Sequence, residues 1–121
     1  MPQVNPRVFV TQNPHRRDRD TDAFVPAFNL HPASTHGELR VLMPPRAAYI
    51  ATDELVKQLE DALEDYDYER GDSILLLGDT SIVCAASGIL ARRALRFTLL
   101  RWDRMLQSYT RVRFDFTPVT A

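Results

Sequence analysis

A continuous apolar run from Ser73 to Leu77, closed by Gly78, limits the folds open to this chain more than any other segment. Such a run is typical of a strand buried on both faces, as the strands of parallel sheets are. Helical patterns precede and follow it, so the local order is helix, strand, helix. A parallel sheet with right-handed crossovers is therefore expected.

The two flanking segments have different helical patterns. The first helix is expected to begin at Thr52 as N-cap, with Asp53 and Glu54 in the first turn, where the helix dipole favours anions. Its apolar residues form one stripe at helical spacing: Leu55, Val56, Leu59, Ala62, Leu63 and Tyr66. The second helix is expected over about residues 81–95 and has little polar surface, so it should pack on the sheet.

Four further strands are predicted, over residues 7–11, 38–43, 97–102 and 109–116. The last two form an antiparallel hairpin around a turn at 103–108. We therefore predict a single α/β domain over residues 1–121. Its sheet is small and mostly parallel, with about five strands and two helices in the order β-β-α-β-α-β-β. Nine residues are expected to be buried together: Leu59, Leu63, Leu75, Leu77, Ile82, Ala86, Ile89, Leu99 and Phe114.

A long irregular arm is expected at about residues 12–37. It begins with a run of charges and then carries four apolar residues, Phe24, Val25, Phe28 and Leu30, in a segment interrupted by prolines. Loops of this length are uncommon in compact domains and are usually either functional or disordered. We expect the arm to cover a partner surface, and the alternative is that it folds back over its own sheet.

The charges are segregated although the net charge is only −1. Residues 52–79 are strongly acidic, and residues 92–113 are rich in arginine. A net charge this small gives no general attraction to nucleic acid or to a membrane. The arginine-rich end of one copy is instead expected to face the acidic helix of another.

Other features indicate an intracellular protein. No segment approaches the ~20 apolar residues of a membrane-spanning helix, and Met1–Pro6 lacks the apolar core of a signal peptide. The only cysteine, Cys84, excludes an internal disulfide and fits a reducing compartment.

The turn Gly78-Asp79-Thr80-Ser81 joins the end of the buried strand to a helix N-terminus. Free N–H groups and the helix dipole can bind an anion there, and ligands of open α/β sheets bind at this edge. However, no dinucleotide fingerprint or phosphate-loop motif is present, and Asp79 would repel phosphate. Helix capping is the preferred interpretation, and phosphate or nucleotide binding at these four residues is the alternative.

The C-terminal hairpin carries basic and aromatic residues: Arg101, Trp102, Tyr109, Arg111 and Arg113. Such a face can bind single-stranded nucleic acid by stacking and charge. The isoelectric point near 6.3 argues against this, and edge strands also carry charge to prevent aggregation. Contact with a protein surface fits the same residues, and nucleic-acid binding stays as an alternative.

No pattern in the chain predicts catalysis, so a non-enzymatic protein is favoured. The three histidines, His15, His31 and His36, lack cysteine partners and metal-binding spacing, so neither a metal site nor another cofactor is predicted. The Asp65-Tyr66-Asp67-Tyr68 stretch superficially resembles the paired aspartates of phosphotransferases in the haloacid dehalogenase family. It follows a helix instead of a buried strand, so a solvated helix end is expected.

Three stretches of the chain resemble a set of small uncharacterised proteins encoded by tailed bacteriophages and environmental phage genomes. They are Val8 to Gln12, Phe28 to Ala33 before Gly37, and the long segment with Leu75-Leu76-Leu77-Gly78-Asp79, Arg92-Arg93, Phe97 to Arg104 and Tyr109. The resemblance carries no known activity. It implies a virion component or an accessory protein in the cytoplasm of a bacterial host.

These observations favour a phage-encoded module for protein–protein interaction or assembly. Its expected partner is a second copy, in a homo-oligomer, or another viral or host protein, and no membrane is expected. The expected interaction surface combines the arm and the hairpin: Phe24, Val25, Phe28, Leu30, Arg101, Tyr109, Arg111 and Arg113.

Overall fold

The computed structural model describes residues 5–45 and 51–119, so most of the Met1–Pro6 segment discussed above lies outside the described residues. It contains a five-stranded sheet in the order β4-β1-β5-β6-β7. The strands are β1 (Arg7–Gln12), β4 (Glu38–Met43), β5 (Ser73–Leu75), β6 (Arg96–Asp103) and β7 (Ser108–Asp115). The first four are parallel, and β7 is antiparallel to β6. The predicted fold class and terminal hairpin are confirmed.

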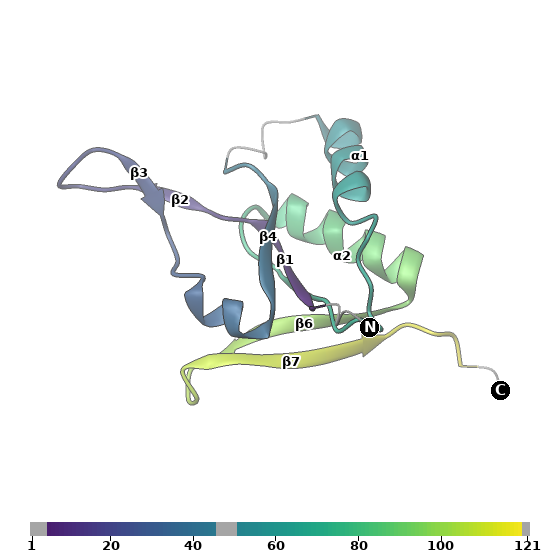
Figure 1. The fold of residues 1–121 in the computed structure, drawn as a ribbon. Helices are drawn as coiled ribbons and strands as arrows, with labels where there is room; N and C mark the ends of the chain where they lie inside the picture. The colour runs from purple at the N-terminus through teal and green to yellow at the C-terminus, as the bar shows by residue number, and fades with distance from the viewer. Residues whose placement is uncertain (1–4, 46–50, 120–121) are drawn as a thin grey trace.

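Both helices, α1 (Thr52–Ala62) and α2 (Thr80–Ala94), pack on one face of the sheet (Figure 1). The reason is the direction of the crossovers. The connections from β4 to β5 and from β5 to β6 move the same way across the sheet, so right-handed crossovers place their helices on the same face. The connection from β1 to β4 moves the opposite way and places the 3-10 helix η1 (His31–His36) on the other face. The N-cap of α1 is Ala51, not Thr52, and it makes no side-chain cap hydrogen bond.

The arm is more ordered than its sequence predicted. Strands β2 (His15–Arg17) and β3 (Phe24–Pro26) form a small antiparallel sheet, which is followed by η1. Ala33 is fully buried under the main sheet, and Leu30 packs beside it. The fold-back alternative is therefore confirmed for the η1 part of the arm. In contrast, Phe24 and Phe28 are 54% and 53% exposed.

The sheet separates two apolar cores, whereas the sequence predicted one. The larger core lies under the helices and contains Phe9, Met43, Leu55, Leu59, Leu63, Ile74, Ile82, Ala86, Ile89, Leu90 and Phe97. The smaller core lies under η1 and contains Val8, Val10, Ala33, Leu75 and Leu100.

Four residues of the predicted common core are therefore placed differently. Leu75 is buried on the face away from the helices, because neighbouring residues of a strand point to opposite faces. Leu77 and Leu99 are only half-buried. Phe114 is 37% exposed on the edge strand β7, where its ring stacks on Phe97.

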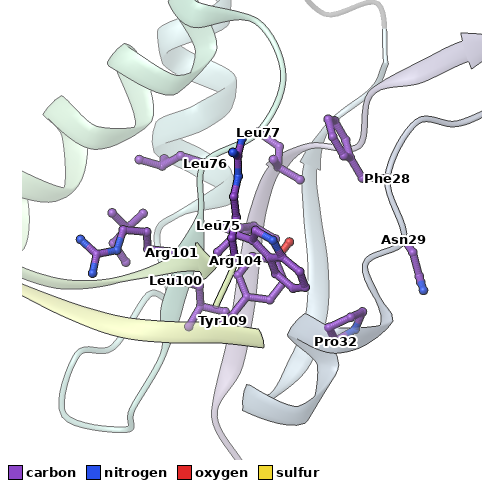
Figure 2. A pocket seen from close by; sticks show the side chains of 12 residues that line it. Phe28, Asn29, Pro32, Leu75, Leu76, Leu77, Leu100, Arg101, Arg104 and Tyr109 are labelled. Carbon is purple, nitrogen blue, oxygen red and sulfur yellow. The ribbon is translucent and has the colours of Figure 1, made fainter. Parts of the chain in front are cut away.

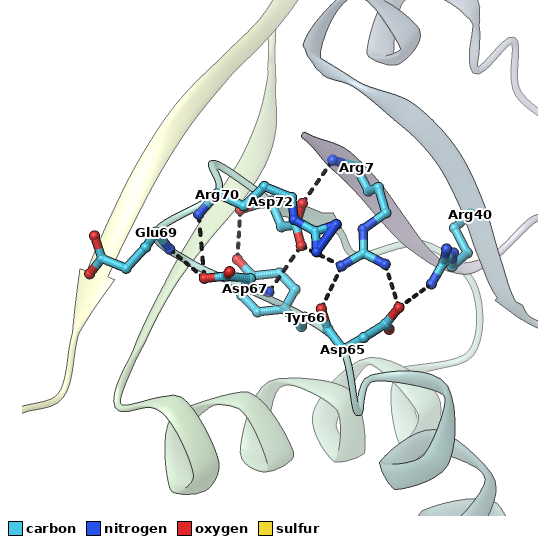
Figure 3. A network of polar contacts seen from close by, with 8 residues as sticks. All are labelled: Arg7, Arg40, Asp65, Tyr66, Asp67, Glu69, Arg70 and Asp72. Carbon is cyan, nitrogen blue, oxygen red and sulfur yellow. Dashed lines mark hydrogen bonds and ion pairs between the residues drawn. The ribbon is translucent and has the colours of Figure 1, made fainter. Parts of the chain in front are cut away.

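A network of charged groups closes the amino-terminal end of the sheet (Figure 3). The buried Asp72 carboxylate accepts hydrogen bonds from the Arg7 N–H (2.8 Å), from Arg7 Nη2 (2.9 Å) and from the Asp67 N–H (2.9 Å). The Arg7 guanidinium also contacts Asp65, which pairs with Arg40 at 2.8 Å. These contacts tie β1 to the α1–β5 loop.

Asp65 is thus part of an ion-pair network instead of a simply solvated helix end. The hydrogen bond from Arg7 and that from Arg40 lower the pKa of Asp65 from 3.8 to about 2. The Tyr66 hydroxyl donates to the Asp72 carbonyl and accepts from the Thr98 N–H. Burial raises the pKa of Tyr66 to about 12.

Candidate functional site

The sheet has a notch where β5 ends early. Strand β5 pairs with β6 through Ile74 and Leu99, and β5 ends one residue later at Leu75. β6 continues for four residues, 100–103, with β7 as its only neighbour in the described part of the sheet. The end of the β6–β7 hairpin therefore separates from the rest of the sheet and leaves a space beside Leu76 and Leu77.

A cavity of about 750 Å³ occupies this notch (Figure 2). We call it the hairpin groove, and its lining residues are Phe28, Asn29, Pro32, Leu75, Leu76, Leu77, Leu99, Leu100, Arg101, Trp102, Arg104 and Tyr109. Leucines form most of its floor, and the arm supplies one wall through Phe28 and Pro32. This volume is within the usual range of ligand cavities, but the lining is apolar and has few groups able to orient a small polar ligand.

Aromatic and basic side chains border the groove on the hairpin side. The rings of Trp102 and Tyr109 meet edge to face, with 5.1 Å between their centroids. Burial raises the pKa of Tyr109. Arg104 also lines the groove, and among the described residues it has no ion-pair partner.

The turn of the hairpin, residues 104–107, exposes two large apolar side chains next to the groove. Met105 is 92% exposed and Leu106 is 65% exposed. The turn has a defined conformation, since Asp103 Oδ1 accepts hydrogen bonds from the N–H groups of Met105 (2.9 Å) and Leu106 (3.1 Å). We call residues 104–107 the hairpin turn.

The structure brings only some of the predicted interaction residues together. Phe28, Tyr109 and Arg101 line the hairpin groove. Strand alternation assigns Arg101 to the face opposite that of Trp102, so the two do not form one flat basic and aromatic surface. Leu30 is half-buried and packs against the smaller core.

The other predicted residues lie elsewhere. Phe24 and Val25 are on the separate β2–β3 hairpin, where the Arg17 guanidinium lies over the Phe24 ring. Arg111 contacts His36 of η1, with 3.4 Å from Nη2 to the His36 carbonyl oxygen. Arg113 is exposed on β7, opposite Thr98.

The Gly78 turn is occupied by contacts within the chain. The Asp79 side chain accepts from the Ser81 N–H at 2.9 Å, which confirms that it caps α2. The Asp79 N–H donates to Gln12 Oε1 at 2.9 Å, and Gln12 Nε2 donates to the carbonyls of Pro44 and Pro45. Two N–H groups that an anion would use are thus already bonded. The phosphate-binding alternative, which includes Thr80, stays a prediction without support from these contacts.

Metal-binding clusters and membrane-spanning helices are both absent from the described part of the chain. Among residues 5–45 and 51–119, no group of three or more histidine, cysteine or acidic side chains is placed to hold a metal ion. No helix within the same residues is long and apolar enough to cross a membrane.

Sequence reasoning missed most of the groove floor and the hairpin turn. The sequence predicts Leu75 and Leu77 as core residues, Pro32 as part of the arm, Leu100 as part of the strand at 97–102, and Met105 as part of the turn at 103–108. One feature of the sequence could have indicated the groove: the apolar run before Gly78 is shorter than the hairpin strand that pairs with it, so the end of the hairpin has no neighbour on that side.

Comparison with known proteins gives one result that identifies the family. Neither the comparison with curated proteins nor that with solved structures gives a match. The family model described as Phage Pam3 gp32-like protein matches residues 6–116, which include all the strands and helices described above. The chain therefore belongs to the Phage Pam3 gp32-like protein family.

Proposed function

We propose that this phage protein is a non-enzymatic interaction or assembly module that acts through the hairpin groove and the adjacent hairpin turn. Its partner is a second copy of the chain or another viral or host protein. The observation that carries the proposal is the position of Met105 and Leu106, exposed on a defined turn beside an apolar cavity of about 750 Å³.

Large apolar side chains at a surface indicate a contact site when they gather in one place. Isolated ones are common, but contiguous exposed apolar patches mark interaction surfaces. Here Phe28, Trp102, Met105 and Leu106 are all at least 40% exposed. Aromatic residues, methionine and arginine are the types enriched in interface cores. The groove contains aromatic residues and arginine, and the adjacent turn supplies the methionine.

The pairing of charges within the chain refines the expected mode of association. The sequence suggested that arginines of one copy face the acidic helix of another. Glu60, Asp65 and Glu69 already have arginine partners within the chain. The proposal therefore places the contact at the groove, and charge has a secondary role at its rim.

Sedimentation velocity of matched variants tests this proposal. Phe28→Asp introduces a charge into the groove wall, whereas Phe24→Asp alters a phenylalanine of nearly equal exposure outside the groove. In the micromolar range we expect the wild type and Phe24→Asp to sediment as assemblies and Phe28→Asp to dissociate. Equal masses for the two variants would contradict a groove-based contact.

A thermal-shift measurement with phosphate and nucleotides tests the ligand-binding alternative. A ligand at ~100 times its dissociation constant stabilises by about 2.7 kcal/mol. The interaction module predicts no shift with millimolar phosphate. A saturable rise in Tm that Ser81→Ala removes would favour the ligand-binding alternative.

A further inference from the structure

The hairpin turn and the hairpin groove are complementary parts of the same end of the molecule. We propose that two copies form a symmetric dimer in which Met105 and Leu106 of each copy occupy the hairpin groove of the other. This inference rests on the proposed function and names its partner as a second copy of the chain.

The turn has the properties of an inserting element. Its two apolar side chains leave most of their surface free, with 92% of Met105 and 65% of Leu106 exposed. The Asp103 carboxylate fixes the backbone that presents them, so little order has to be gained on binding. Methionine is flexible and fills irregular apolar cavities well, and the groove is lined mainly by leucine and aromatic side chains.

A chain cannot place its hairpin turn in its own groove. Strands β6 and β7 pair as far as Asp103 and Ser108, which flank the turn directly. Arg104, the first residue of the turn, already forms part of the groove rim. In the proposed dimer, the groove that receives Met105 and Leu106 is therefore that of the other copy.

The closeness of turn and groove favours a twofold arrangement. When one turn enters the neighbouring groove, the neighbour's turn lies beside the first groove, so both insertions occur together. Such an isologous contact uses the same patch on both copies and closes at two. In Figure 1 the hairpin turn lies at one end of β7 and residues 116–119 continue from the other end, where the Phe116 N–H donates to the Leu95 carbonyl. Residues 116–119 therefore leave the hairpin turn uncovered.

Charge complementarity supports a second copy as the occupant. Arg104 lines the groove, Asp103 precedes it directly in the chain, and neither has an ion-pair partner among the described residues of its own chain. In the proposed dimer we expect Arg104 of one copy to pair with Asp103 of the other. The proposed interface thus has an apolar centre, formed by Met105 and Leu106 in the grooves, and two equivalent Asp103–Arg104 pairs at its edge.

The first test compares the masses of two variants with matched exposure. Met105 is 92% exposed and Val119, which is distant in sequence from the groove, is 96% exposed, so neither substitution should disturb folding. We expect the wild type and Val119→Asp to sediment as dimers and Met105→Asp as a single chain with unchanged circular dichroism. A Met105→Asp protein that remains dimeric would overturn the inference.

The second test locates the contact by cross-linking in a Cys84→Ser background, because Cys84 is exposed. A tagged Met105→Cys protein is mixed with an untagged Asn29→Cys protein, Asn29 being a groove residue. We expect a tagged–untagged disulfide dimer, and no such product when Val119→Cys replaces Met105→Cys.

The outcomes separate the two proposals. A wild-type dimer without this cross-link, and with Met105→Asp still dimeric, would overturn the insertion and leave the assembly function standing. A wild-type protein that is monomeric throughout the micromolar range would overturn both the insertion and self-assembly.

Discussion

Substitution of Asp72 by asparagine should strongly destabilise the fold without changing its shape. The carboxylate is fully buried and accepts three hydrogen bonds, two from Arg7 and one from the Asp67 N–H. An asparagine side chain has the same size, but its amide has only one acceptor oxygen. The NH₂ group that replaces the second oxygen is a donor, and it would face an N–H donor of Arg7 or Asp67. The Arg7 guanidinium also loses a buried negative partner.

Breaking a buried ion pair from one side typically costs 3–5 kcal/mol. Arg7 keeps its contact with Asp65, so we expect the lower end of that range, about 3 kcal/mol. Urea unfolding should show a lower midpoint with an unchanged m-value.

Asp67→Asn is the matched control for this experiment. The Asp67 carboxylate accepts from the N–H groups of Glu69 and Arg70 in an exposed turn, where asparagine can act as the acceptor equally well. Its cost should stay below about 0.5 kcal/mol, as at ordinary surface positions. If Asp72→Asn were no more destabilising than Asp67→Asn, the network would not hold β1 to the α1–β5 loop.

Three further outcomes follow from the structure. Gly78→Ala should destabilise the protein, since Gly78 has a φ of +96° and a Cβ there would lie 2.1 Å from Gln12 Oε1. Gly88→Ala should instead stabilise α2 by roughly 0.5–1 kcal/mol, because a Cβ there would meet no heavy atom within 4 Å beyond its chain neighbours and the nearby backbone of its own helix. Equal thermal-unfolding midpoints for the two variants would refute this contrast. Leu75→Ala should cost roughly 2–5 kcal/mol in urea unfolding, as truncations of buried leucine do, and a loss below about 0.5 kcal/mol would contradict its burial. The pKa of Asp65 is about 2 in the folded protein against an ordinary value of 3.8, so its carboxylate stabilises the fold above about pH 4 and this contribution is lost towards pH 2. The difference in unfolding free energy between wild type and Asp65→Asn should be under about 1 kcal/mol for a half-exposed pair and should fall to zero between pH 4 and pH 2. A difference that grew over this interval would contradict the assignment.

The framework of the fold could be predicted because it depends on strong local patterns. The apolar run before Gly78 indicated a strand buried on both faces, and β5 is buried throughout. The stripe of α1 and the two long hairpin strands were equally clear. The same run could not assign Leu75 to a face, because a strand that is apolar on both sides has no alternation to interpret.

The arm and the groove were harder to predict for physical reasons. Strands β2 and β3 have three residues each, which is too short for a period to appear. The groove depends on where β5 ends, and this is determined by distant contacts. Thr11 Oγ1 donates to the Leu77 carbonyl and accepts from the Leu77 N–H, which takes that residue away from β6. No local pattern near Leu77 carries that information.

Fluorescence of Trp102 tests the assembly surface most directly, because it is the only tryptophan in the chain and it lines the hairpin groove. The ring is 40% exposed in the single chain, so acrylamide should quench it efficiently in dilute solution. If a second copy fills the groove, quenching will fall and the emission will shift to shorter wavelength as the concentration rises through the micromolar range. Met105→Asp should keep the behaviour of the dilute protein. Quenching that is independent of concentration while the mass increases would place the interface elsewhere and contradict the account.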